Sequence, residues 1–255
     1  MQSSAGAPAP ASFTFPKGET QPMATDTKIL LVLTSQATMG DDPRPTGVWF
    51  EELSTPYYAF VDAGLTVEIA SVAGGNVPVD PHSIEAEGSR APSVARFLAD
   101  AAAMTRLRQS LALDTVSADG YAAVFLPGGH GTMWDLATSE RLAGLLSAAW
   151  ADGKVVAAVC HGPAGLVNAR DVDGKPLVAG RRVSAFTNRE EAAAQLTEVV
   201  PFLLETRLRE LGARYESGPD FEPFALRDGR LVTGQNPASS ERAAQLVLEA
   251  LAAGK

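Results

Sequence analysis

The sequence predicts an α/β fold, a three-layer sandwich with a mostly parallel central sheet and helices on both faces. Two observations support this prediction. Short apolar runs, long enough for buried strands, recur along the chain and end at Gly, Pro or small polar residues. Segments with helical spacing separate these runs, and strands that alternate with helices indicate a parallel sheet covered on both sides.

The first elements form a strand–helix–strand unit. The apolar run 28–34 predicts a strand buried on both faces, and a loop over 35–46 follows it. Pro56 suits the first turn of a helix and Gly64 suits the C′ position, so we expect a helix between them. The run 66–71 predicts the second strand, which completes a βαβ unit.

The middle of the chain returns to regular structure after an irregular stretch. Residues 73–92 contain several Gly and Pro residues and predict loops. The elements predicted next are helices over 94–103 and 105–111, a strand over 122–126, a helix over 139–151 and a strand over 154–159. The glycine-rich turn 127–131 follows the third strand, and Gly153 ends the helix that precedes the fourth.

The last third contains shorter elements. The predicted elements are a strand over 183–186, helices at 189–191 and 201–211, a strand over 231–234 and a helix over 239–252. Thr187 and Asn188 are candidate caps for the first of these helices. Asp173-Gly174 and Asp228-Gly229 predict two hairpin turns.

Composition sets the domain organisation and limits the possible partners. With 255 residues, 45% of them hydrophobic, the chain can bury a full core; we expect one domain over 27–255 and a disordered or loosely docked tail over 1–26. The net charge of −9 argues against nucleic-acid binding, which needs a basic patch. No apolar run approaches the ~20 residues of a membrane span, and the N-terminus lacks the pattern of a secretory signal. We therefore expect a cytoplasmic protein without a membrane partner.

The chain's one cysteine, Cys160, is the leading candidate for a reactive residue. The apolar run 154–159 leads straight into it, and His161-Gly162-Pro163 ends the run. Pro163 suits the first turn of a helix, so we expect Cys160 on a sharp strand-to-helix turn with its sulfur at the positive end of that helix. That placement lowers a thiol pKa and favours the thiolate. The alternative is a buried structural cysteine. A single cysteine also excludes an internal disulfide and fits a reducing compartment.

The order of residues along the chain limits the chemistry open to Cys160. The three histidines are His82, His130 and His161. A papain-like or amidotransferase triad takes its histidine from a later part of the chain, so neither can form here. The base must be His161 or a carboxylate. Ligands bind beyond the carboxyl ends of parallel strands, so we expect Cys160, the 127–131 turn and the loop before Glu52 to converge there.

Four segments make the sequence resemble a known superfamily. They are Thr46-Gly47-Val48-Trp49-Phe50-Glu51-Glu52-Leu53, Phe125-Leu126-Pro127-Gly128-Gly129-His130-Gly131, Ala158-Val159-Cys160-His161-Gly162-Pro163 and Asp228-Gly229-Arg230-Leu231-Val232-Thr233-Gly234-Gln235-Asn236-Pro237. With these motifs the chain resembles the ThiJ/PfpI superfamily, which has a class I glutamine amidotransferase-like fold, and within it the glutathione-independent glyoxalase (glyoxalase III) and stress-chaperone group. The resemblance runs from about residue 28 to residue 252 and implies a flavodoxin-like sandwich.

The resemblance also implies which residues form the site. The expected catalytic residues are Cys160, His161 and Glu52, the last being the buried glutamate that hydrogen-bonds the sulfur in this group. The expected substrate- or oxyanion-binding residues are Gly128, Gly129, His130 and Glu191. Because each acid has an acidic neighbour, Glu51 is the alternative to Glu52 and Glu190 the alternative to Glu191.

Backbone N–H groups and the third histidine are the remaining candidates for the site. The backbone N–H groups of Gly129 and His161 are candidates for holding an oxyanion. His82 is most simply a surface residue. Three dispersed histidines make a weak case for zinc, so we expect no metal and no cofactor.

The function that the resemblance implies is conversion of methylglyoxal, a small 2-oxoaldehyde, to D-lactate through a Cys160 hemithioacetal. Such an enzyme is a glyoxalase III-type lyase (D-lactate dehydratase), and relatives are commonly homodimers. The alternatives are a stress-related holdase chaperone, or a deglycase that repairs glycated protein or nucleotide at the same cysteine. A peptidase built from Cys160, His161 and a glutamate is a weaker third alternative.

Overall fold

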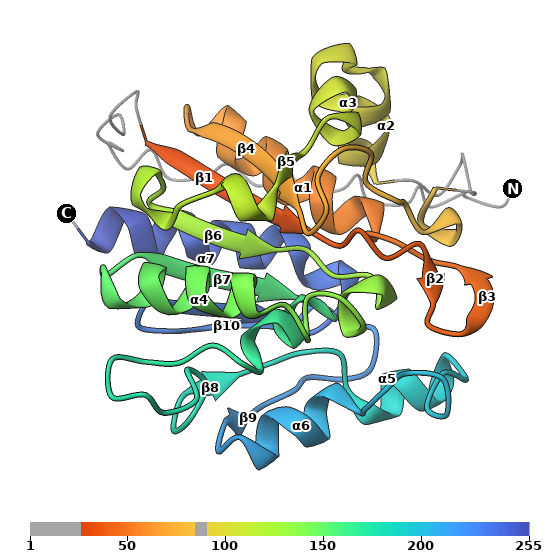
Figure 1. Ribbon diagram of the computed structural model, residues 1–255, viewed down its shortest axis with the longest axis vertical. Coiled ribbons are helices and arrows are strands. Elements are labelled where there is room, and N and C mark those ends of the chain that lie inside the picture. Colours follow the sequence, from red (N-terminus) through yellow and green to blue (C-terminus); the bar gives the residue numbers. More distant parts are fainter. Residues whose placement is uncertain (1–26, 85–90, 255) are drawn as a thin grey trace, which may run out of the picture.

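A seven-stranded sheet forms the centre of the computed structural model, which describes residues 27–84 and 91–254 (Figure 1). The strand order is β10-β11-β7-β6-β1-β4-β5, and every neighbouring pair is parallel except β10 with β11. The bounds are β1 Lys28–Leu33, β4 Thr66–Ser71, β5 Leu111–Ala112, β6 Ala123–Leu126, β7 Val155–Val159, β10 Ala225–Asp228 and β11 Leu231–Gly234. The predicted mostly parallel sheet is confirmed.

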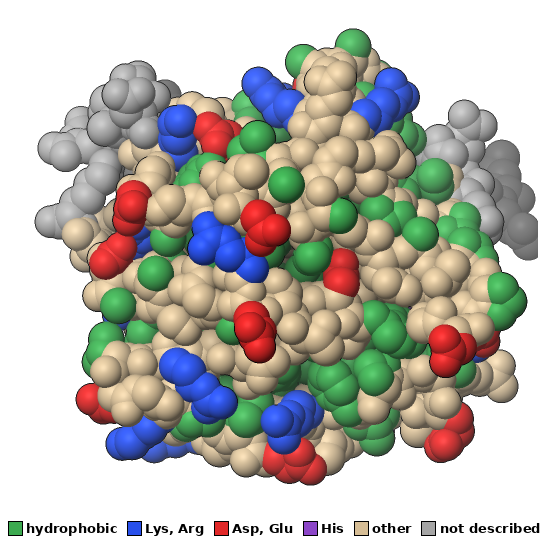
Figure 2. Space-filling model, in the orientation of Figure 1, with side chains coloured by type: hydrophobic (Ala, Val, Ile, Leu, Met, Phe, Trp, Pro, Cys, Tyr) green, Lys and Arg blue, Asp and Glu red, His purple; other side chains and the backbone are tan. Residues whose placement is uncertain are grey.

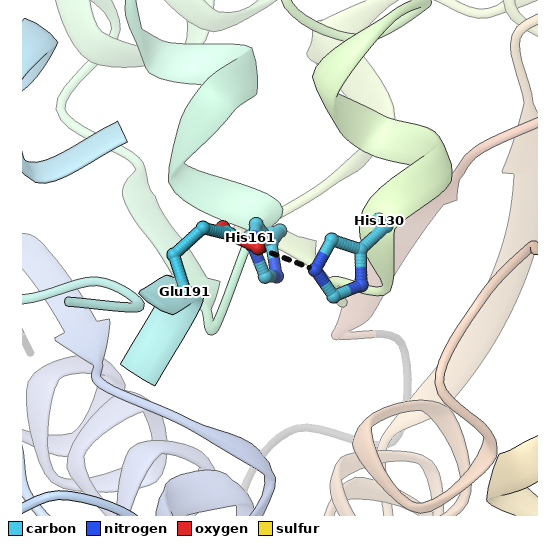
Figure 3. A group of neighbouring side chains, drawn as sticks. All are labelled: His130, His161 and Glu191. Atoms are coloured by element: carbon cyan, nitrogen blue, oxygen red, sulfur yellow. Dashed lines mark hydrogen bonds and ion pairs between the residues drawn. The ribbon is translucent and has the colours of Figure 1, made fainter. Parts of the chain in front are cut away.

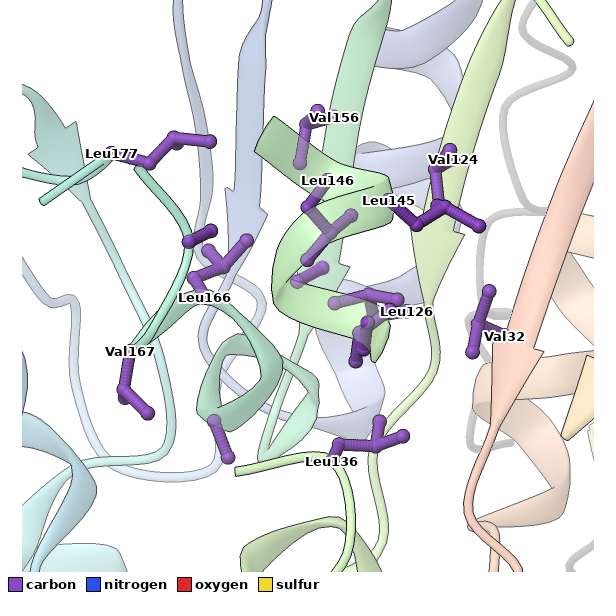
Figure 4. Packing of buried hydrophobic residues seen from close by; sticks show 14 of the residues in the cluster. Val32, Val124, Leu126, Leu136, Leu145, Leu146, Val156, Leu166, Val167 and Leu177 are labelled. Carbon is purple, nitrogen blue, oxygen red and sulfur yellow. The ribbon is translucent and has the colours of Figure 1, made fainter. Parts of the chain in front are cut away.

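Helices cover both faces of the sheet, which confirms the three-layer sandwich. One face packs against α4, and the core on that face includes Val124 and Val156 of the sheet together with Leu204 and Leu208 of α6 (Figure 4). The other face packs against α1, α2, α3 and α7. The α-helices are α1 Phe50–Asp62, α2 Pro92–Ala99, α3 Ala101–Arg108, α4 Glu140–Ala151, α5 Asn188–Ala193, α6 Leu204–Glu210 and α7 Ser240–Ala253. The 3₁₀ helices are η1 Pro81–Ser83, η2 Leu113–Thr115, η3 Ala118–Gly120, η4 His130–Met133, η5 Gly162–Leu166 and η6 Pro237–Ser239.

Strand β7 shows why its sequence is continuously apolar. Val155, Ala157 and Val159 belong to the core on one face of the sheet, whereas Val156 and Ala158 belong to the core on the other. A strand buried on both faces has no solvent-facing position for a polar residue. The neighbouring strands β6 and β7 run in register and end together, so the segments that follow them lie side by side.

Helix α1 begins earlier than predicted. It starts at Phe50, so Pro56 lies inside the helix instead of in its first turn. Pro56 has no N–H to donate to the carbonyl of Glu52, and this lost bond is offset by the burial of one face of the helix, including Leu53 and Phe60. The predicted end is confirmed, because Gly64 follows the helix with φ +82°.

Several loop predictions need correction. Segment 35–46 contains a hairpin, β2 Thr38–Met39 with β3 Asp42–Pro45, although Pro43 and Pro45 argued against strands. A two-stranded ribbon needs few ladder hydrogen bonds and therefore tolerates proline. The strand predicted over 183–186 is shorter and lies outside the central sheet, as β8 Arg182–Val183 paired with β9 Arg214–Tyr215.

Helix boundaries and turns differ in smaller ways. The helix predicted over 94–103 breaks at Asp100, whose carboxylate caps α3, and the helix predicted from 201 begins at Leu204. The Asp228-Gly229 turn joins β10 to β11, as predicted. The Asp173-Gly174 turn closes only an isolated bridge between Arg170 and Pro176. The predicted tail over 1–26 lies outside the described residues. In the part of the chain that the structure describes, no helix has the length and apolar character to cross a membrane.

Candidate active site

The turn after β7 holds Cys160 in a strained conformation. Its φ is +59°, a left-handed value that is uncommon for any residue other than glycine. Such strain is typical of a nucleophile placed on a sharp turn at the end of a strand. The predicted turn is therefore present, but the helix after it is the short 3₁₀ helix η5, with Pro163 in its first turn. A helix of this length has a small dipole to stabilise a thiolate.

The turn after β6 lies against Cys160 and binds the first acidic residue. The N–H of Gly128 donates to Oε2 of Glu52 at 2.7 Å. A side chain at Gly128 would place its Cβ 2.6 Å from the His161 nitrogen and 2.8 Å from Glu52 Oε2, so only glycine fits. Gly128 was predicted to bind substrate, but its N–H is already used to hold Glu52. Gly129 has φ +98° and keeps its predicted place beside the site.

Glu52 is fully buried in the first turn of α1. Burial raises the pKa of its carboxyl to about 8, because the single hydrogen bond from Gly128 and the contact with Cys160 only partly offset the loss of water. Its other oxygen, Oε1, makes no hydrogen bond of ordinary geometry to any described residue. Glu52 is therefore protonated at neutral pH, with an O–H available next to the sulfur.

The structure contradicts the expected low pKa of Cys160. Burial raises the pKa of the thiol, and the neighbouring Glu52 raises it further because two negative charges would share one dry site. The N–H of His161 acts in the opposite direction but is weaker. Cys160 is buried, with 4% of its surface exposed. The resting nucleophile is a thiol that must lose its proton as it reacts.

His161 is placed to take that proton. Its Nδ1 lies 3.3 Å from Cys160 Sγ, and its Nε2 lies 2.7 Å from Glu191 Oε2. Burial, together with the nearby His130, lowers the pKa of His161, so the ring is neutral at rest. An ionised carboxylate only accepts hydrogen bonds, so Nε2 carries the proton and Nδ1 presents a lone pair to the thiol.

Glu191 bridges the neighbouring rings of His130 and His161 (Figure 3). Its Oε1 is 2.9 Å from His130 Nε2, and its Oε2 accepts from His161. Burial alone would raise the pKa of Glu191, but the two imidazoles hold it well below its usual range. The sequence placed Glu191 among the substrate-binding residues. In the structure it completes a chain from Cys160 through His161, and His130 shares it from the other side.

The two adjacent-acid alternatives are separated by their contacts. Glu190 accepts five hydrogen bonds, from the N–H and hydroxyl of Thr187, the N–H of Phe221 and the amides of Gln235 and Asn236. It therefore anchors the start of α5 and does not contact His161. Glu51 is only partly buried, and that burial raises its pKa. Glu52 and Glu191 are thus the acids that lie against Cys160 and His161.

One neighbour of the site was missed. The ring of Phe186 lies 4.5 Å from that of His161, and its N–H donates to the carbonyl of Cys160. The sequence signal that could have identified Phe186 is its place in the Phe186-Thr187 turn, just before the segment that contains Glu191.

The same groups form the described set that could ligate a metal. The Nε2 atoms of His130 and His161 and the carboxylate of Glu191 lie within 4.8 Å of one another. The sequence treated these histidines as dispersed, and folding brings two of them together with ring centroids 4.0 Å apart. Each histidine already hydrogen-bonds one carboxylate oxygen of Glu191 through its Nε2, so an ion bound to these atoms would replace both bonds.

A pocket of about 560 Å³ lies beside His130. Its walls come from the β2–β3 hairpin, from Trp49 just before α1, from the loop around η1 and from the residues after α5. His82 is exposed, as the sequence suggested; it also lines this pocket, and its ring is paired with Asp80 at 3.0 Å.

Comparison with known proteins identifies the family. A sequence model described as the DJ-1/PfpI family matches residues 46–250. The chain belongs to the DJ-1/PfpI family. This assignment agrees with the resemblance to ThiJ/PfpI proteins and with the flavodoxin-like sheet.

Relatives within the DJ-1/PfpI family carry informative names. The glutathione-independent glyoxalase HSP31 of Saccharomyces cerevisiae is 32% identical over 88% of this chain and 98% of its own length. The crystal structure of glyoxalase III from Candida albicans superposes with a TM-score of 0.81 and 28% identity, over 89% of this chain and 98% of that one. The protein/nucleic acid deglycase HchA of Pseudomonas aeruginosa is 29% identical over 79% of this chain and 73% of its own length.

Proposed function

We propose that the protein is a glutathione-independent glyoxalase that converts methylglyoxal to D-lactate. The observation that carries the proposal is the placement of Cys160 between a protonated carboxyl, Glu52, and a neutral imidazole, His161, backed by Glu191. The nucleophile Cys160, the acid Glu52 and the base His161 therefore lie next to one another. The relatives named as glyoxalases support the same activity.

The first step is addition of the thiol to the aldehyde. Cys160 Sγ bonds to C1 while its proton moves to Nδ1 of His161, and Glu52 gives its proton to the aldehyde oxygen. The product is a hemithioacetal. Glu191 stabilises the imidazolium because it accepts the hydrogen bond from Nε2.

The second step moves hydrogen from C1 to C2. The Glu52 carboxylate removes the C1 proton to give an enediol and then returns it to C2. The imidazolium of His161 gives its proton to the C2 oxygen and takes one back from the C1 hydroxyl, which leaves a thioester at C1 on Cys160 and a hydroxyl at C2. Water then releases lactate and the free thiol. C1 is oxidised and C2 reduced within one molecule, so the reaction balances without an external oxidant. The pKa of about 8 suits Glu52 to both halves of this transfer.

The proposal also covers the substrate, the cofactor requirement, the compartment and the oligomeric state. The substrate is a small 2-oxoaldehyde, and the residues around Cys160 supply the chemistry without glutathione, metal or cofactor. A free thiol as nucleophile fits the reducing cytoplasm. We expect the active form to be a homodimer without a nucleic-acid partner.

The direct test is incubation of the purified protein with methylglyoxal in the absence of glutathione, with D-lactate as the readout. We expect turnover by the wild type and none by Cys160→Ala. A wild type that makes no D-lactate contradicts the proposal.

A deglycase acting at the same cysteine is the second candidate, and the HchA relative favours it. It is tested by following release of a glycated peptide's adduct under conditions where free methylglyoxal is trapped. A holdase needs a large exposed apolar patch. Among the described residues the exposed large hydrophobic side chains are Leu111, Val172 and Phe221, on three separate segments. Figure 2 shows apolar side chains spread among charged ones, with one larger apolar group in the lower half of this face. Aggregation suppression that persists in Cys160→Ala would favour the chaperone.

A further inference from the structure

The pocket beside His130 is mainly apolar. Its apolar lining consists of Met39, Pro45, Trp49, Pro81, Ala194 and Leu196. Binding pockets of this volume usually hold ligands of drug size. Methylglyoxal has three carbons, so it would fill only a small part of the space.

The charged groups of the pocket already have partners. Arg44 pairs with Asp42 at 2.7 Å. Asp80 accepts from Thr46 at 3.1 Å and is paired with the His82 ring, while His130 is paired with Glu191. A charged ligand would have to compete with these pairs. The lining therefore favours an uncharged group that gains by burying apolar surface.

The pocket adjoins the catalytic residues. His130 forms part of its wall, and the ring of His130 lies 4.0 Å from that of His161. Trp49, on another wall, donates its N–H to the carbonyl of Gly128, whose own N–H holds Glu52. Through these two wall residues the pocket is linked to His161 and to Glu52, the groups that lie next to the Cys160 sulfur.

We propose that the preferred substrates are 2-oxoaldehydes whose substituent is an uncharged, apolar chain several carbons longer than methyl, with Trp49, Ala194 and Leu196 determining this specificity. The proposal rests on the glyoxalase function proposed above. The chemistry at C1 and C2 is unchanged, and the products are the corresponding 2-hydroxy acids. Each methylene that enters the pocket should raise kcat/KM by roughly fourfold until the chain is fully buried.

The test compares kcat/KM for a series of aldehydes. We expect 2-oxoheptanal to exceed methylglyoxal by at least tenfold, with 2-oxopentanal between them. We expect 4,5-dioxopentanoate, which has a carboxylate end, to be worse than 2-oxopentanal. Equal or falling values along the series, or a preference for the carboxylate, would overturn the specificity proposal while turnover of methylglyoxal kept the glyoxalase function. No turnover of any aldehyde would overturn both.

Variants locate the effect in the pocket. Ala194 is exposed at the rim, so Ala194→Trp can fill the pocket without disturbing the core. We expect it to lower the ratio of kcat/KM for 2-oxoheptanal to that for methylglyoxal at least fivefold, and Leu196→Ala to lower it by a smaller factor. The matched control is Leu111→Ala, which removes an exposed leucine from β5 and should leave the ratio as in the wild type. An unchanged ratio in both pocket variants would contradict the assignment.

Discussion

Two glutamates approach the reactive pair Cys160–His161 from opposite sides, and they are in opposite states. Glu52 is fully buried, and among the described residues it accepts one N–H, from Gly128, so burial raises its pKa to about 8. Glu191 is almost as buried, but each of its oxygens hydrogen-bonds an imidazole, so its pKa falls. The comparison shows that neighbours, more than depth of burial, decide which carboxyl is the acid and which is the fixed negative charge.

The two glutamates also differ in how they are held. Glu52 is held by the backbone N–H of Gly128, in the turn after β6. Both oxygens of Glu191 instead bind histidine side chains. A substitution of one glutamate can therefore change its own carboxyl and leave the contacts of the other glutamate intact. The following predictions use this difference, in order of decreasing effect.

The largest effect is expected from Glu191→Gln. The amide has no negative charge to stabilise the His161 imidazolium, and its NH₂ group can force the wrong tautomer on the ring. We expect kcat/KM for methylglyoxal to fall about 10³-fold, measured by D-lactate formation. Glu210→Gln, which removes an exposed carboxylate on α6, is the control and should stay within twofold of the wild type. A Glu191→Gln enzyme with near-normal activity would show that the charge is not needed.

Glu52→Gln should lower activity by about 10²-fold, since an amide cannot carry the proton between C1 and C2. The pH profile separates this role from a structural one. Wild-type activity should fall above about pH 8, where Glu52 ionises beside the sulfur. The residual activity of Glu52→Gln should lack that alkaline limb. If the limb persists unchanged in the variant, another group is responsible for it.

Stability should respond to pH in opposite directions at the two sites. Glu52 has a folded-state pKa above its ordinary 4.5, so its contribution is fully present below pH 4.5 and is lost as pH rises towards 8. Glu191 has a lowered pKa, so its contribution is present above about pH 4.5 and is lost as pH falls. Relative to the wild type, Glu52→Gln should gain stability as pH rises from 4.5 towards 8, on the order of 1 kcal/mol per pH unit. Urea unfolding at pH 5 and pH 8 measures this gain, and equal gains at both would contradict it.

The smallest effect is expected from metal removal. The His130–Glu191–His161 group is complete as a hydrogen-bonded unit, so EDTA should change activity by less than twofold. Added Zn²⁺ should inhibit, because it would take Nε2 of His161 and shift the ring proton to Nδ1, where the thiol needs a lone pair. Loss of activity on dialysis against EDTA, restored by zinc, would reverse this interpretation.

The sequence predicted local features better than long-range ones. Buried strands such as β1 and β7 are visible as apolar runs because both faces are covered, and the turn at Cys160 follows from the Gly and Pro residues after it. The direction of the Cys160 pKa was wrong because a local helix argument cannot include Glu52, a residue 108 positions away that buries the thiol and adds charge. The second hydrogen bond of Glu191, to His130, likewise depends on two distant turns meeting.

Cys160 and His161 are consecutive residues, and this has a consequence for how the enzyme would fail. The distance between nucleophile and base is set mainly by one peptide unit, so gentle heating or small shifts between strands leave that pair together. The carboxyls of Glu52 and Glu191 belong to α1 and α5, which are far from Cys160 in the sequence. They can therefore move away from the pair when the packing of these helices loosens. Partial loosening should therefore yield a protein whose thiol still reacts with alkylating agents after turnover has stopped.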